Sequence, residues 1–187
     1  MTEDKPKPIA SRCYCGLMWP DKGYPAYCCV LGEKPVAKSK TFDPQEGLEI
    51  YLERESKTLS DLFEFLGTLK EVRCKTVCAN LDRKYHSYIR ELNKWRRESG
   101  SSLRLKATNS SSFEASIMKI KETILNNNLT FPEDSGVKSQ LSIFAKHNLT
   151  DDAECYAVKA LAMVIGEFTK RNQMDAAETV PDRRAWW

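Results

Sequence analysis

The sequence lacks the features that would place it in a membrane or outside the cell. Its 187 residues contain no run of about 18 apolar residues, the length that a membrane-spanning helix needs. The N-terminal stretch MTEDKPKPIA lacks the apolar centre of a secretory signal peptide. The seven cysteines do not form the even framework of a small secreted domain, so we expect free thiols in a reducing cytosol.

A strong net charge and the common catalytic motifs are also missing. The 29 Lys and Arg residues nearly balance the 26 Asp and Glu residues, so any contact with nucleic acid must come from a local patch. No G-x-x-x-x-G-K-[ST] segment is present, which excludes NTP hydrolysis by a P-loop. Neither histidine, His86 or His147, lies beside a G-x-S-x-G motif, so a hydrolase triad has no support.

Two pairs of cysteines near the N-terminus could suggest a zinc site. Such a site needs four ligands that converge on the ion. The two pairs are Cys13 and Cys15, and the adjacent Cys28 and Cys29. Neighbouring residues of a strand point to opposite faces of the sheet, so the second pair cannot both face the first. We therefore interpret these cysteines as small buried side chains.

The hydrophobic pattern predicts one α/β domain between two arms. Residues 1–11 form a flexible N-terminal arm, residues 12–170 the domain, and residues 171–187 a flexible polar tail that ends RRAWW. Three strands followed by strands alternating with helices indicate a mixed five-stranded sheet flanked by helices. The strands are expected at 12–19, 24–33, 47–55, 74–79 and 103–108, and the helices at 58–72, 82–97, 110–125, 138–146 and 150–168. Residues 129–131 are expected to form a short extended piece.

The best amphipathic helix of the chain follows two adjacent aspartates. Asp151 and Asp152 would lie in its first turn, after Thr150 as the N-cap. The two carboxylates either complement the helix dipole or contribute to a Mg²⁺ or Mn²⁺ site, since these ions prefer oxygen ligands. His147 either joins such a site or is an exposed loop residue.

Other charged residues have an equally open interpretation. A basic run around Trp95 either contacts phosphates or forms a solvated face, and it consists of Lys94, Arg96, Arg97, Arg104 and Lys106. The acids Glu33, Glu49 and Glu53, on or beside the first strands, are expected to be solvated.

Three features together resemble the nuclease domain of phage terminase large subunits, which has the RNase H-like fold. The first is the order of strands and helices. The second is the stretch LEIYLERESKTLSDLFEFLGTLKEVRCKTVCANLD, which looks like that family's third strand, first helix and fourth strand. The third is Asp151-Asp152-Ala153, which opens a helix of small residues after a linking helix. The resemblance covers roughly residues 12–170 and implies a sheet order of 3-2-1-4-5, with the first three strands an antiparallel meander.

This resemblance implies a metal-dependent DNA endonuclease of a phage DNA-packaging system, encoded by a phage or prophage and working in the bacterial cytosol. Two Mg²⁺ or Mn²⁺ ions would be held by three or four carboxylates. The implied partners are double-stranded DNA and a separate terminase ATPase, a small terminase subunit or a portal protein. An alternative is a degenerate RNase H-like domain that binds DNA or a motor partner without cleaving. A third interpretation is an unrelated α/β binding protein, which a sheet order of 3-2-1-4-5 would exclude.

The expected acids match this sequence unevenly. The first-strand aspartate falls on Met18, whose thioether is a poor ligand for Mg²⁺. Asp21, in the following turn, would replace it if the strand register shifts. The fourth-strand acid falls on Asn80 or on Asp82, which otherwise caps the next helix. The candidate catalytic residues are Asp151, Asp152, Asp82 and Asp21, with Asp151, Asp152 and Asp82 as metal ligands.

Overall fold

The computed structural model describes residues 12–21, 23–34, 47–108, 113–126, 128–144 and 155–178. Its strands are β1 (Cys13–Met18), β2 (Ala26–Glu33), β3 (Leu48–Ser56), β4 (Thr76–Ala79), β5 (Arg104–Ala107) and β6 (Leu129–Thr130). Its helices are α1 (Leu59–Thr68), the short 3₁₀ helix η1 (Arg83–Tyr85), α2 (His86–Glu98), α3 (Phe113–Leu125), α4 (Gly136–Phe144) and α5 (Tyr156–Glu178). None of the described helices is long and apolar enough to cross a membrane.

The strands form one mixed sheet with the order β5-β4-β1-β2-β3-β6. Strands β1, β2 and β3 pair as an antiparallel meander, and β4 and β5 extend the sheet in parallel from β1. The predicted 3-2-1-4-5 order is confirmed. The predicted number of strands is corrected from five to six, because the short extended piece pairs in parallel with β3 through Leu48 and Leu129.

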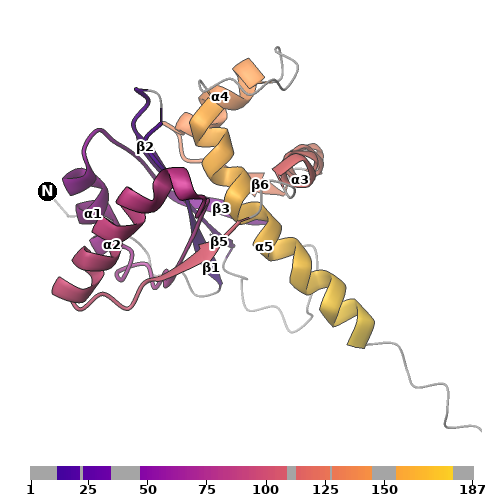
Figure 1. Cartoon of the computed structure of the whole chain (residues 1–187). Coiled ribbons are helices and arrows are strands. Elements are labelled where there is room, and N and C mark those ends of the chain that lie inside the picture. Colours follow the sequence, from indigo (N-terminus) through magenta and orange to yellow (C-terminus); the bar gives the residue numbers. More distant parts are fainter. Residues whose placement is uncertain are drawn as a thin grey trace, which may run out of the picture.

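Helices cover both faces of this sheet (Figure 1). Helices α1 and α2 pack on one face, and α5 packs on the other with α3 and α4 against it. Side chains alternate along each strand, so Cys28 belongs to the first core and Cys29 to the second, as predicted. All seven cysteines are free thiols.

Helix α5 is the central helix of the second core. The predicted apolar face is buried from Ala157 to Phe168, and Val158 and Ala162 are buried as well. The reason is that β1 and β2 cover one side of α5 while α3 and α4 cover others. The helix continues to Glu178, beyond its expected end at residue 168.

Helix α1 has well-defined ends. Thr58 and Asp61 form a reciprocal capping box at its start. After its last turn the chain reverses through Arg73, a residue other than glycine with φ of 59°. A left-handed conformation costs an ordinary residue about 1–2 kcal/mol. The turn is held by a hydrogen bond from the Cys74 amide to the Leu69 carbonyl, at 2.9 Å.

Candidate functional site

The candidate site lies at the edge where β1 and β4 end. These strands are parallel neighbours, with Gly16 paired to Cys78 and Leu17 to Ala79. Met18 follows Leu17 and Asn80 follows Ala79, so these two residues reach the same edge of the sheet side by side. The carboxyl ends of neighbouring parallel strands are the usual place for a functional site in such sheets.

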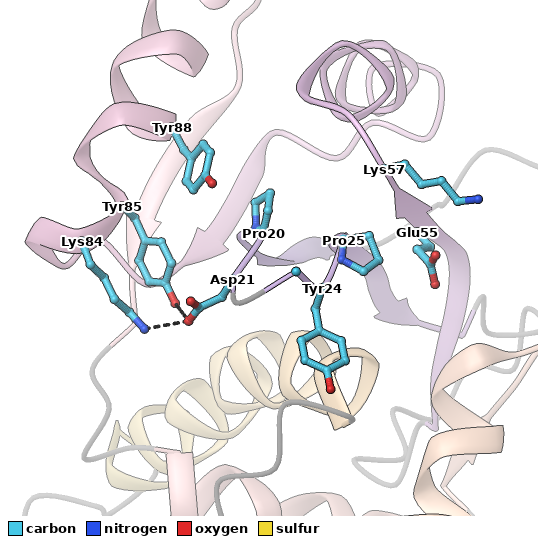
Figure 2. Close-up of a pocket in the computed structure, with 10 residues that line it drawn as sticks. Pro20, Asp21, Tyr24, Pro25, Glu55, Lys57, Lys84, Tyr85 and Tyr88 are labelled. Carbon is cyan, nitrogen blue, oxygen red and sulfur yellow. Dashed lines mark hydrogen bonds and ion pairs between the residues drawn. The ribbon is translucent and has the colours of Figure 1, made fainter.

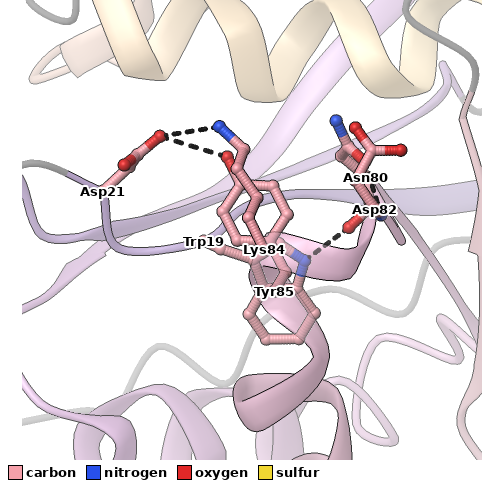
Figure 3. Close-up of polar contacts among 6 residues, drawn as sticks. All are labelled: Trp19, Asp21, Asn80, Asp82, Lys84 and Tyr85. Atoms are coloured by element: carbon pink, nitrogen blue, oxygen red, sulfur yellow. Dashed lines mark hydrogen bonds and ion pairs between the residues drawn. The ribbon is translucent and has the colours of Figure 1, made fainter.

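Trp19 holds the two strand ends together. Its buried indole donates a hydrogen bond from Nε1 to the Asn80 carbonyl oxygen, at 2.8 Å. Its ring stacks on Tyr88, with 6.0 Å between the ring centres and 13° between the planes. Figure 3 shows the hydrogen bond between Trp19 and Asn80. The stacking on Tyr88 fixes the end of β1 against the start of α2 as well.

The two candidates for the fourth-strand acid have different surroundings. The side-chain oxygen of Asn80 accepts a hydrogen bond from the Asp82 amide, at 2.8 Å, so the Asn80 side chain folds back onto its own loop. Asp82 is exposed and precedes η1, but its carboxylate does not cap that helix. The capping interpretation of Asp82 therefore has no support, and its carboxylate stays at the edge.

Asp21 lies in the turn beyond β1. The register of β1 against β2 is regular up to the pair of Met18 with Tyr27, so no shift brings Asp21 into the strand. Its carboxylate accepts hydrogen bonds from Lys84 Nζ at 2.9 Å and from the Tyr85 hydroxyl at 3.3 Å. The hydrogen bonds to Tyr85 and Asp21 raise the pKa of Lys84. Figure 3 shows the Asp21 and Asp82 carboxylates on either side of Lys84.

The start of α5 reaches the same edge of the sheet. The Tyr156 hydroxyl donates to Glu55 near the end of β3, at 2.7 Å. Its ring lies 5.9 Å from that of Tyr24, in the β1–β2 turn. Asp151 and Asp152, predicted in the first turn of this helix, lie outside the described residues, as does His147. The described part of α5 thus begins beside the strand ends that carry the other candidates.

Within the described ranges, no group of three or more His, Cys, Asp or Glu side chains is placed to hold a metal ion. Asp82 is the described candidate whose carboxylate stays at the edge, since Asp21 is paired with Lys84. A divalent ion here would need further carboxylates, and Asp151 and Asp152 are those that the resemblance supplies.

A cavity of about 610 Å³ opens beside this edge (Figure 2). The β1–β2 turn, the end of β3 and the start of α2 form its walls. Two lysines and two acids line it, so its charge is balanced, and three tyrosines supply aromatic surface: Lys57, Lys84, Asp21, Glu55, Tyr24, Tyr85 and Tyr88. The contact of Lys84 and Tyr85 with Asp21 joins residues more than 60 positions apart, so no local sequence signal could predict it.

The basic run predicted around Trp95 does not converge on this cavity. Lys94, Arg97 and Arg104 are exposed, and Arg96 donates to the Asn93 side chain. Lys106 forms an ion pair with Glu167 of α5. These contacts favour the interpretation as a mostly solvated face.

Comparisons with known proteins identify the fold through structure alone. Neither a protein-family model nor a curated protein sequence matches the chain. The large terminase nuclease of thermophilic phage G20c with bound zinc is similar at a TM-score of 0.56 and 17% identity, over 84% of this chain and 82% of that chain. The same nuclease with bound magnesium gives 0.55 and 15% over the same shares. Thermus thermophilus RuvC gives 0.50 and 11%, over 86% of this chain and 96% of its own. The chain therefore has the RNase H-like fold of these proteins.

Proposed function

We propose that this chain is a terminase-type nuclease module that cuts DNA with Mg²⁺ or Mn²⁺ in a phage DNA-packaging system. The main support is that the ends of β1 and β4 and the start of α5 meet at one edge of the sheet. At this edge the Asp82 carboxylate is exposed and does not cap η1. The structural similarity to the G20c nuclease supports this assignment. Its substrate would be double-stranded DNA in the host cytosol. A separate ATPase, a small terminase subunit or a portal protein would be its partner.

The roles of the residues follow from their positions. Asp82, Asp151 and Asp152 would hold the metal, which when bound activates water and stabilises the leaving oxygen of a phosphodiester. Trp19 fixes the strand ends that carry the site. Lys57 beside the cavity offers charge to DNA phosphates, whereas the charge of Lys84 is paired with Asp21.

A non-cleaving domain that binds DNA or a motor partner is the second candidate. Two observations favour it. Met18 occupies the first-strand acid position in an unshifted register, and the Asn80 side chain is engaged by its own loop. Both candidates use the same edge, so cleavage itself must separate them.

The double variant Asp151→Ala/Asp152→Ala is expected to abolish metal-dependent cleavage of plasmid DNA. Its melting temperature should stay at or above that of the wild type, because removing carboxylates from an acidic cluster relieves like-charge repulsion. Cleavage is measured in Mg²⁺ and in Mn²⁺, with EDTA as the metal-free control. The exposed acids Glu133 and Asp134 provide a matched control, since Glu133→Ala/Asp134→Ala should cut normally.

Two outcomes would contradict different parts of this proposal. Normal cutting by the Asp151→Ala/Asp152→Ala variant would reject these residues as the ligands. No cutting by the wild type, with DNA still retained in a gel shift, would establish the non-cleaving candidate.

Asp82→Asn should lower the rate of cleavage at least about 100-fold, because an amide replaces a charged ligand. Its unfolding midpoint should not change, since the Asp82 carboxylate is exposed and caps no helix. Single-turnover rates and urea unfolding are the two measurements. An unchanged rate would remove Asp82 from the site and leave the fourth strand without an acid.

A further inference from the structure

A second cavity lies at the opposite end of β4 from the candidate site. It measures about 710 Å³ and is formed where α1 and α2 end and where the chain enters β4 and β5. Leu66, Trp95 and Leu103 give it an apolar floor. Lys70, Arg73 and Lys75, all exposed, contribute its charge. We call it the basic pocket.

The described residues do not balance the charge of the basic pocket. Among the described residues that line it there is no Asp or Glu. No carboxylate in the described part of the chain forms an ion pair with Lys70, Arg73 or Lys75. The two helix ends contribute about −0.5 charge each. The three cationic side chains together carry a charge of +3, so roughly two positive charges remain after the helix ends are neutralised.

Arg73 gives an independent reason to regard this pocket as functional. It occupies the reversal after α1 with φ of 59°, where glycine would close the same turn without strain. A strained residue that also lines a cavity is a recognised sign of a functional position. The chain thus has a long cationic side chain at a position where the backbone conformation favours glycine.

We propose that the basic pocket binds an acidic peptide segment of a protein partner, with an apolar side chain of the peptide on the Leu66, Trp95 and Leu103 floor. Carboxylates of the peptide would pair with Lys70, Arg73 and Lys75. The apolar floor favours a peptide over a nucleic-acid backbone, because a peptide can bury an apolar side chain there and a phosphate backbone cannot. The proposal does not depend on DNA cleavage.

The test is fluorescence anisotropy with the labelled peptide DEDLFDED at low ionic strength. The wild type should bind it, and Lys70→Glu/Lys75→Glu should weaken binding at least about tenfold. The matched control reverses two exposed charges elsewhere, Arg90→Glu/Lys121→Glu, and should bind as the wild type does. The peptide DEDGSDED, without apolar residues, should bind more weakly than DEDLFDED because it leaves the floor uncovered.

Arg73→Gly separates a loss of binding from a loss of folding, because it should weaken binding while it stabilises the protein. It should raise the melting temperature by about 2–4 °C through relief of strain, and it should weaken peptide binding. Equal losses in the pocket and control variants would overturn the proposal, as would the absence of peptide binding to the wild type. Displacement of the peptide by a short DNA duplex, with the duplex itself sensitive to Lys70→Glu/Lys75→Glu, would assign the pocket to DNA instead.

Discussion

Gly16→Ala is expected to lower the free energy of unfolding by about 3 kcal/mol, more than a buried methyl group usually costs. Gly16 lies in β1 and faces α5. A Cβ atom at this position would overlap the carbonyl oxygen of Ala160 and lie 2.9 Å from its carbonyl carbon. Both atoms belong to the backbone of a helix, so the overlap is relieved only by moving α5 away from the sheet.

The consequence for function follows from where α5 begins. Tyr156 in its first turn contacts the site edge, and a displaced α5 would shift that turn relative to the ends of β1 and β4. We therefore expect Gly16→Ala to lose cleavage together with stability. Urea unfolding followed by circular dichroism measures the first effect, and plasmid cleavage measures the second.

Gly67→Ala is the matched control for this substitution. In α1 the nearest atom to a Cβ at Gly67 is Cζ2 of Trp95, at 3.8 Å, which is an ordinary contact. Alanine in a helix should therefore raise stability by about 0.5–1 kcal/mol. Equal stability of the Gly16→Ala and wild-type proteins would contradict the close approach of β1 and α5.

The sequence predicts the elements better than it predicts their contacts. Alternation and helical spacing are local patterns, and they place β1 to β5 and the described α-helices, although α5 ends at Glu178 instead of at residue 168. The role of Gly16 has no local signal, because it depends on a helix that follows about 140 residues later. The sixth strand was missed for a similar reason, since the two residues of β6 pair with β3 and carry too little pattern to indicate a strand.

The site was predictable to the extent that it depends on chain position. The resemblance offers Asn80 or Asp82 as the fourth-strand acid position, and in the structure both follow the end of β4, where the Asp82 carboxylate does not cap η1. The role of Asp82 as a metal ligand stays a prediction. The ion pair of Asp21 with Lys84 depends on the packing of the β1–β2 turn against η1, which no periodicity encodes. The expectation that Glu53 is solvated is wrong, because its partners Tyr27 and Ser135 come from distant parts of the chain.

Glu53→Ala should lower the free energy of unfolding by about 3 kcal/mol, because it leaves several buried groups without a hydrogen-bond partner. The Glu53 carboxylate accepts from the Tyr27 hydroxyl and the Ser135 hydroxyl, both at 2.5 Å, and from the Val137 amide at 3.0 Å. Tyr27 and Ser135 are 5% and 6% exposed, so water cannot replace the lost acceptor freely. The carboxylate also lies at the start of α4, where negative charge is favoured.

The same site makes stability depend on alkaline pH. Burial, and then the hydrogen bond to Glu53, raise the pKa of Tyr27 above its ordinary value. Its proton is therefore held more tightly in the folded state, so this contribution to stability is complete below about pH 10 and is lost as the pH rises further. In Glu53→Gln the burial remains while the charge disappears, so the alkaline loss should become smaller without vanishing. Glu49→Ala, on the same strand, is the control and should keep the wild-type stability within about 0.5 kcal/mol. If Glu53→Ala unfolds at the same urea concentration as Glu49→Ala, then β3 does not anchor α4 through this carboxylate.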